Sequence, residues 1–380
     1  MRTMVGRLLF SICVLVSITG CWDHKVMQDI SYISALGIDY VDDQFVVYTQ
    51  VMDFSTVGKM EGAKGEPNLW VNKGAGSSFA LAFNDLYNSS QQRTFVGHNM
   101  TVVFTDKALQ KDLVQTMDTF ERYTEARYTP LLYTTLEPIG DLFSLKSIFP
   151  STPLITLLHA PEGNYKQHSM IRPIKMLEFA ALYRERSASI SIPTLAIDKK
   201  KWKKGESKLP VMTQNGAIFI HLGKKPRWMS KDDLLGMRWL EEKTARTPLT
   251  LNDNKGHIKA LLPCEDPKVK ISSEIASNGE PVYNILIKVR ATVNQLNVKM
   301  TIDQLRSEAR ASIESEIRST FAAGQKNNVD VYHLEENMFR KRYEDWKKLT
   351  TGQDFPMSKV TLGDIKVDVA ISDAGKKKLK

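Results

Sequence analysis

Apolar and polar residues alternate most clearly in the last third of the chain, with the period of two that is typical of β-strands. Residues 269–275 and 285–293 alternate in this way, and Asn278-Gly279 between them is a common turn sequence. We therefore predict a β-hairpin over these residues. The pattern returns at 365–371, where it predicts one more strand.

The segment between these strands has apolar residues at a spacing of three or four, which predicts helices. Thr301 and Gln304 form the sequence of a capping box at the start of the first helix, and Gly324 is expected to end it. A second helix is predicted over 334–349. Two strands, two helices and a final strand predict a C-terminal antiparallel sheet flanked by helices.

The first two thirds of the chain mix both periods. Short runs rich in β-branched and aromatic residues predict strands at 45–51, 99–104, 128–135, 189–197 and 216–220. Helical spacing predicts helices at 106–123, at 173–186, after a Ser77 cap and after a Ser230 cap. Gly74-Ala75-Gly76 is expected to form the turn before the Ser77 helix. The predicted fold class is therefore α+β, in a mixed α/β, multidomain chain.

Changes in composition divide the chain into segments. Five lysines around Trp202 interrupt the pattern at 199–204 and predict a linker or an exposed hairpin between two domains. A length of 380 residues agrees with two or three domains, and we expect three subdomains. The expected segments are a signal peptide at 1–20, an N-terminal domain at 21–198, a basic linker at 199–208, a C-terminal domain at 209–374 that could divide near 263, and a basic tail at 375–380.

The N-terminus has the pattern of an export signal. Arg2 and Arg7 flank the start of an apolar run that is long enough for a signal peptide and too short to span a bilayer. The run leads to Gly20 and Cys21, a sequence that resembles a bacterial lipobox. We expect cleavage between these two residues and a diacylglyceryl group on the Cys21 sulfur. The alternative is an N-terminal core element with a buried cysteine.

Two lysine clusters, at 199–204 and 376–378, contribute to the net charge of +9. Each is either a solvated segment or a contact with anionic lipid headgroups, where a nearby lysine contributes about 1 kcal/mol. Neither cluster lies in a nucleic-acid-binding motif, so we expect no nucleic-acid partner.

The sequence contains no recognisable catalytic or cofactor motif. There is no His-Glu-x-x-His, Cys-x-x-Cys, Walker A or Gly-x-Ser-x-Gly pattern. Gly74-Ala75-Gly76 lacks the third glycine of a dinucleotide-binding fingerprint. We therefore expect no enzyme activity, no catalytic residue, no metal and no cofactor. With Cys21 lipidated, Cys264 has no cysteine partner in the mature chain and is expected to be structural.

Four residues are candidates for interface or structural roles. Trp22 beside the lipid is expected at the level of the headgroups, and Asp23 follows it. Asp39 is expected at a strand end and turn, where it either hydrogen-bonds to backbone or meets a partner. His98 follows Gly97 at the entrance of a strand, where a hydrogen-bonded structural role competes with an interface or pH-sensing role.

A set of short motifs and single residues follows one another along the chain. They are Cys21-Trp22-Asp23, Leu36-Gly37-Ile38-Asp39, Arg93, His98, Gly216-Ala217-Ile218-Phe219, Gly236, Trp239 and Leu240. In this order and spacing they resemble the Ger(x)C family of spore germination lipoproteins, over nearly the whole mature chain. After Asp330, the chain lacks the glycines that the family leads us to expect.

The resemblance implies a noncatalytic C subunit of a nutrient germinant receptor from an endospore-forming bacterium. Such a subunit is a three-domain α/β lipoprotein on the outer face of the spore inner membrane, where it acts with two integral membrane subunits of the A and B types. Two alternatives from other classes stay open. An exported solute-binding lipoprotein would need a ligand cleft, and an exported cell-wall hydrolase would need clustered carboxylates or a metal site.

Overall fold

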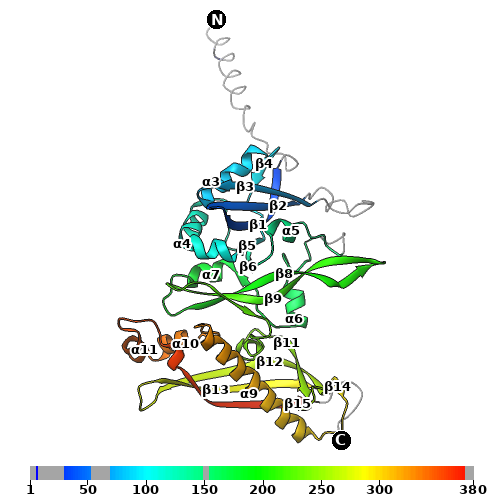
Figure 1. Ribbon diagram of the computed structural model, residues 1–380, viewed down its shortest axis with the longest axis vertical. Helices are drawn as coiled ribbons and strands as arrows, with labels where there is room; N and C mark the ends of the chain where they lie inside the picture. Colours follow the sequence, from blue (N-terminus) through cyan, green and yellow to red (C-terminus); the bar gives the residue numbers. More distant parts are fainter. Residues whose placement is uncertain (1–5, 7–29, 53–68, 149–153, 373–380) are drawn as a thin grey trace.

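The computed structural model describes residue 6 and residues 30–52, 69–148 and 154–372. The strands form two sheets (Figure 1). The first has the order β10-β9-β8-β6-β5-β1-β2-β3, with β4 beside β1 and β7 beside β6, and the second has the order β11-β12-β13-β15, with β14 beside β12. Helices pack on both sheets, which confirms the predicted α+β class.

The first sheet and its helices occupy residues 30–230. Its strands are β1 (Ile30–Val41), β2 (Gln44–Met52), β3 (Leu69–Gly76), β4 (Arg93–Phe95), β5 (Thr101–Thr105), β6 (Leu131–Thr135), β7 (Ile174–Lys175), β8 (Ser189–Lys204), β9 (Ser207–His221) and β10 (Arg227–Ser230). Its helices are α3 (Phe79–Asp85), η2 (Leu86–Asn88), α4 (Asp106–Arg122), α5 (Ile139–Phe143), α6 (Glu162–Gln167) and α7 (Met176–Leu182).

The second sheet and its helices follow in the chain. Its strands are β11 (Arg246–Asn252), β12 (Ile258–Ile275), β13 (Pro281–Thr292), β14 (Gln295–Leu296) and β15 (Thr361–Ser372). The helices are α8 (Met237–Leu240), α9 (Ile302–Lys326), α10 (Leu334–Lys341), α11 (Tyr343–Thr350) and η3 (Met357–Lys359).

The centre of the first sheet consists of parallel strands. β1, β5, β6 and β8 run parallel, and antiparallel strands flank them on both sides. Every residue of β5 and β6 is buried because helices cover both faces. α3, α4 and α7 cover one face through Phe83, Phe120 and Phe179, and α5 covers the other through Leu142 and Phe143.

The second sheet is built around the predicted hairpin, which forms β12 and β13. Gly279 in its turn has φ +81°, a conformation that favours glycine. α9 lies across one face (Figure 1) and buries Leu305, Ile313 and Ile317. Its Thr301 capping box with Gln304 is confirmed.

The second sheet is mostly antiparallel, as predicted, and only its last strand departs from the prediction. β15 pairs with β13 in parallel, with Val282 opposite Thr361. After β13, helices α9, α10 and α11 carry the chain back across the sheet, so β15 enters from the same end as β13. Position 263, where a division of the C-terminal domain was expected, lies inside β12.

Most strand positions were predicted correctly, but the prediction of a turn at Gly74-Ala75-Gly76 was wrong. These residues belong to β3 and pair with β2. The helix after them is capped by Ser78 rather than Ser77. Glycine is required because α3 lies directly on the strand: a Cβ added to Gly74 would lie 2.4 Å from the carbonyl oxygen of Ala82.

The predicted linker at 199–208 is instead the end of the hairpin between β8 and β9. Trp202 pairs with Leu209, and Lys203 pairs with Lys208. The first sheet continues through this hairpin to β10, so the chain does not leave it at residue 198. Of the two forms that the sequence allowed, a linker or an exposed hairpin, the structure shows the hairpin.

Tertiary contacts also change four predicted helices. The start of 173–186 forms β7, which pairs with β6, so α7 begins at Met176. Ser230 caps only a turn, and α8 begins at Met237. α9 continues past Gly324 to Lys326. The segment 334–349 is divided at Arg342, which leaves the helical conformation and donates to the Ser273 carbonyl oxygen at 2.8 Å.

Candidate functional site

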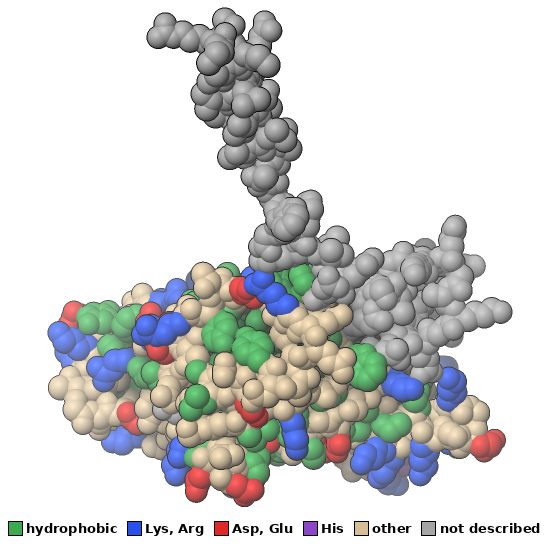
Figure 2. Space-filling view, turned by 90° about the horizontal axis from the view of Figure 1, so that it is seen from above, with side chains coloured by type: hydrophobic (Ala, Val, Ile, Leu, Met, Phe, Trp, Pro, Cys, Tyr) green, Lys and Arg blue, Asp and Glu red, His purple; other side chains and the backbone are tan. Residues whose placement is uncertain are grey.

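The expected lipidation site lies outside the part of the chain that the structure describes. Gly20, Cys21, Trp22 and Asp23 are all in the range 7–29. The described fold begins at Ile30, at the upper end of the molecule in Figure 1. Figure 2 shows this end from above, where exposed apolar side chains lie among uncharged, basic and acidic ones. Among the described helices, none combines the length and the apolar character that crossing a bilayer requires.

Asp39 lies within β1, and not at the expected strand end and turn. The turn comes later, at Asp42 and Asp43, which have φ +49° and +59°. The Asp39 Oδ1 accepts hydrogen bonds from the Thr105 hydroxyl at 2.6 Å and from the Tyr40 N–H at 2.8 Å. Since Thr105 is the N-cap of α4, Asp39 connects β1 to the start of that helix.

His98 is exposed and packs against aromatic rings. Its ring centroid lies 5.2 Å from that of Tyr32 and 5.6 Å from that of Phe95, both in edge-on geometry. Tyr32 and Phe95 face each other in the β1–β4 pair at the start of the fold. Arg93, the first residue of β4, forms a 3.2 Å ion pair with Glu125. The His98 contacts therefore lie at the end of the sheet where β1 begins.

Cys264 is buried in β12, as expected of a structural cysteine. Its side chain is 0% exposed, and the thiol lies 3.6 Å from the Leu262 carbonyl oxygen. Burial raises the pKa of the Cys264 thiol to about 12. The thiolate needed for reactive chemistry is therefore disfavoured.

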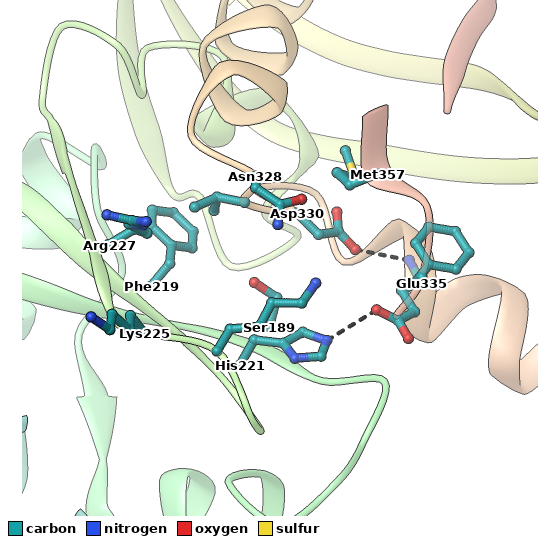
Figure 3. Close-up of a pocket in the computed structure, with 12 residues that line it drawn as sticks. Ser189, Phe219, His221, Lys225, Arg227, Asn328, Asp330, Glu335 and Met357 are labelled. Atoms are coloured by element: carbon teal, nitrogen blue, oxygen red, sulfur yellow. Dashed lines mark hydrogen bonds and ion pairs between the residues drawn. The ribbon is translucent and has the colours of Figure 1, made fainter. Parts of the chain in front are cut away.

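A polar network that sequence reasoning missed joins the first sheet to the C-terminal helices (Figure 3). The Nε2 atom of His221, at the end of β9, lies 3.0 Å from a Glu335 carboxylate oxygen. The other carboxylate oxygen accepts a 3.1 Å hydrogen bond from the Trp346 indole. The His221 and Glu335 side chains are only 15% and 5% exposed. The buried carboxylate is thus satisfied from both sides.

Asp330 organises the turn that carries Glu335. Its carboxylate accepts hydrogen bonds from the N–H groups of Tyr332 at 3.2 Å and Glu335 at 2.8 Å. Burial raises the Asp330 pKa, and the nearby His333 opposes this rise. His333 has φ +55° and ψ +37°, a left-handed conformation that favours glycine. The turn therefore demands at His333 a backbone conformation that glycine would adopt at lower cost.

These residues line a shallow pocket between β8, β9 and the C-terminal helices. One wall is basic and the other carries the carboxylates. Its cavity volume of ≈ 20 Å³ holds about one water molecule. It therefore does not enclose a nutrient such as an amino acid or a sugar. The lining residues are Ser189, Phe219, His221, Lys224, Lys225, Arg227, Asn328, Val329, Asp330, Glu335, Phe355 and Met357.

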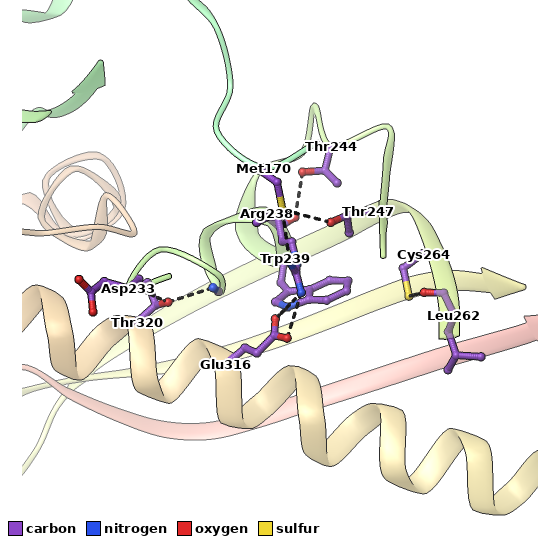
Figure 4. Close-up of polar contacts among 11 residues, drawn as sticks. Met170, Asp233, Arg238, Trp239, Thr244, Thr247, Leu262, Cys264, Glu316 and Thr320 are labelled. Carbon is purple, nitrogen blue, oxygen red and sulfur yellow. Dashed lines mark hydrogen bonds and ion pairs between the residues drawn. The ribbon is translucent and has the colours of Figure 1, made fainter. Parts of the chain in front are cut away.

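A second network fixes α9 to α8 (Figure 4). The Glu316 carboxylate accepts two hydrogen bonds from Arg238, at 2.8 and 2.9 Å, and one from the Trp239 indole at 2.6 Å. Burial raises the Glu316 pKa and lowers that of Arg238, and each partner's charge opposes the shift. Gly236 lets the helices approach, since an added Cβ would lie 2.6 Å from the Glu316 carbonyl oxygen.

The structure thus gives packing roles to the matching residues of the C-terminal half. Gly236 and Trp239 hold α8 against α9, and a Cβ added to Gly216 would lie 2.2 Å from the Met229 carbonyl oxygen. Trp239 is 0% exposed, as expected of a core residue. Within the described residues, no group of three or more His, Cys, Asp or Glu residues is placed to hold a metal.

Glu316 could have been recognised from the sequence, whereas the His221–Glu335 contact could not. Glu316 comes three residues after Ile313 and four before Thr320, so it lies on the apolar face of the predicted helix. A carboxylate on that face signals a buried partner. His221 and Glu335 are 114 residues apart, and no spacing rule connects them.

Two protein-family models match the chain and together cover most of it. Residues 23–197 match the spore germination protein N-terminal domain. Residues 214–375 match the domain described as spore germination B3/GerAC like, C-terminal.

Individual relatives agree with these family models. The chain is 23% identical to spore germination protein KC of Bacillus subtilis (strain 168), over 96% of this chain and 94% of that protein. It is 24% identical to spore germination protein B3 of the same organism, over 74% of this chain and 72% of that protein. The crystal structure of the GerBC protein has the same fold, with a TM-score of 0.52 and 17% identity over 90% of this chain and 97% of that one. The chain therefore belongs to the GerAC-like family of spore germination proteins, as a C-type germinant receptor subunit.

Proposed function

We propose that this protein is a noncatalytic, lipid-anchored subunit of a nutrient germinant receptor on the outer face of the spore inner membrane. It acts there with two integral membrane subunits of the A and B types. The observation that carries the proposal is the match of residues 23–197 and 214–375 to the two germination-protein domains. Those matches account for most of the chain that follows the expected signal peptide.

The anchor is a lipid on Cys21. The basic start, the apolar run and the Gly20-Cys21 pair support it. Two or more acyl chains hold a protein stably at a membrane, whereas one chain does so only marginally. Anchoring raises the effective concentration of the protein beside its membrane partners, so a weak contact becomes persistent.

The protein assembles and positions a receptor, and it does not catalyse a reaction. The buried titratable groups support this, because Asp330, Glu335 and Glu316 all accept hydrogen bonds from neighbouring elements of the same chain. Such groups hold the fold together instead of facing a substrate. The pocket near His221 holds about one water molecule, so it does not support the solute-binding alternative.

The test is affinity purification of the tagged full-length protein from detergent-solubilised spore inner membranes, followed by mass spectrometry. We expect a lipidated Cys21 peptide and two polytopic membrane proteins. Cells that express the tag on an unrelated spore lipoprotein provide the control. Recovery of the protein alone, or with transporter components of vegetative cells, would contradict the proposal.

A further inference from the structure

The hairpin between β8 and β9 extends beyond the core of the protein. Ile197 and Met212 still pack at the edge of a hydrophobic cluster. Beyond them, every residue of 199–208 is exposed, and the hairpin projects from the side of the molecule (Figure 1). The segment therefore has no neighbouring layer to stabilise it among the described residues.

The charges of this hairpin are mostly positive, and Asp198 at its base offsets one of them through a 3.4 Å ion pair with Lys201. Residues 199–208 contain six lysines and one acidic residue, Glu206. Lys203 lies directly opposite Lys208 in the strand pair, and like charges in opposite positions destabilise a sheet. A projecting two-stranded ribbon is only marginally stable by itself. A surface of opposite charge would relieve this repulsion.

An exposed tryptophan lies among the lysines. Trp202 is 46% exposed and pairs with Leu209 near the tip. Tryptophan is favoured at the membrane–water interface, where one part of the ring is apolar and another is polar. Lysines beside it supply diffuse positive charge, and residues 199–208 contain no arginine, the residue suited to fixed bidentate pairing. This combination fits a fluid anionic surface better than a single acidic site on a protein.

We infer that residues 199–208 form a second membrane contact, with the lysines at anionic phospholipid headgroups and Trp202 at the interface. The inference rests on the proposed lipid anchor, which keeps the bilayer close. Nine peptide steps separate Cys21 from Ile30 and span at most about 30 Å. The inference places the side that carries the hairpin against the bilayer. The two contacts together fix the orientation of the receptor subunit.

The experiment uses the lipidated protein, purified after expression in a sporulating host and reconstituted into vesicles. Ser207→Cys places a thiol beside the hairpin tip for an environment-sensitive dye, while the buried Cys264 stays unlabelled. Mass spectrometry confirms the labelled peptide. The control probe is Thr250→Cys, at an exposed position of β11. The vesicles contain phosphatidylcholine alone or about one third phosphatidylglycerol, and some carry spin-labelled lipids that quench the dye.

We expect a blue shift and quenching of the Ser207→Cys probe with anionic vesicles only, and a loss of both in high salt. The combined change Lys200→Gln, Lys203→Gln and Lys208→Gln should lower the quenching at least about tenfold. The matched control replaces three exposed lysines of the second sheet with glutamine. It should leave the quenching of the Ser207→Cys probe unchanged. These lysines are Lys268, Lys288 and Lys366.

Flotation of the vesicles separates this inference from the anchor itself. A protein that floats in high salt while the Ser207→Cys probe stays silent in anionic vesicles overturns the hairpin contact and leaves the anchor intact. A protein that floats only in low salt, with a quenched probe, supports the hairpin contact and contradicts the anchor. Equal quenching of the Thr250→Cys probe overturns the hairpin contact.

Discussion

The Trp239 indole donates a 2.6 Å hydrogen bond to the Glu316 carboxylate that also pairs with Arg238. This relationship places α8 on α9 and so fixes the connection between the first sheet and the second. Arg238 is 5% exposed. Its charge therefore depends on Glu316 for compensation.

Glu316→Ala should lower the free energy of unfolding by about 3 kcal/mol, because it leaves the buried Arg238 without its carboxylate. Glu314→Ala on the same helix is the matched control. Glu314 pairs with Arg318 at the surface, where an ion pair contributes less than about 1 kcal/mol. Urea unfolding followed by circular dichroism measures both variants, and equal losses would contradict the assigned role of Glu316.

His159 should make the fold sensitive to mild acid. It is buried against Thr101 and Gln50, and burial lowers its pKa from 6.5 to about 4. The unfolded chain therefore binds this proton more readily than the folded one, so stability is present above about pH 6.5 and is lost as the pH falls towards 4. The expected loss from this residue is about 2 kcal/mol between about pH 7 and pH 5.

The measurement compares the pH dependence of unfolding in the wild type and in His159→Asn. The variant is expected to be less stable at neutral pH. Its free energy of unfolding should fall by about 2 kcal/mol less than that of the wild type between about pH 7 and pH 5. An unchanged pH profile would show that His159 is not the titrating group.

His333→Gly should stabilise the protein by about 1 kcal/mol, since it removes the cost of a left-handed backbone conformation at φ +55°. His333→Ala keeps a Cβ and should give no such gain. Thermal unfolding of the wild type and of both variants at the same pH measures the change. A gain of equal size in the alanine variant would assign the effect to the loss of the ring.

Cys21→Ala should reduce the membrane-bound fraction of the protein at least about tenfold, because the lipid can no longer be attached. The nutrient response of the spores should fall with it, while the globular part remains folded. Cys264→Ala, which removes the buried cysteine, should keep both membrane retention and germination. Membrane retention and germination that are unchanged in Cys21→Ala spores would refute the anchoring mechanism.

The local elements were predictable where one short segment contains the whole signal. The capping box at Thr301 and the hairpin turn at Gly279 depend on residues within a few positions of each other. The predicted helix at 173–186 failed at its start because Ile174 and Lys175 pair with β6. The partner of Ile174 is Leu132, 42 residues earlier in the chain, which is not visible in the periodicity of that segment.

The candidate site was only partly predictable for the same reason. Trp239 matches the family in sequence, and the structure buries it completely. The role of Asp39 was left open by the sequence. Its carboxylate accepts a hydrogen bond from the hydroxyl of Thr105, which is 66 residues away in the chain. His221 and Glu335 had no sequence signal, because their contact depends on how the C-terminal helices pack beside β9.

By itself, the sequence determined the α+β class and the family, and it predicted a lipid anchor, because each is recorded in local periodicity or in short ordered motifs. The tertiary structure alone decided that the lysine segment is a projecting hairpin and that β15 joins its sheet in parallel. It also decided that the family glycines serve close packing. These features depend on which distant segments share a surface, and free energy gained by burying those surfaces outweighs the weaker local preferences of the chain.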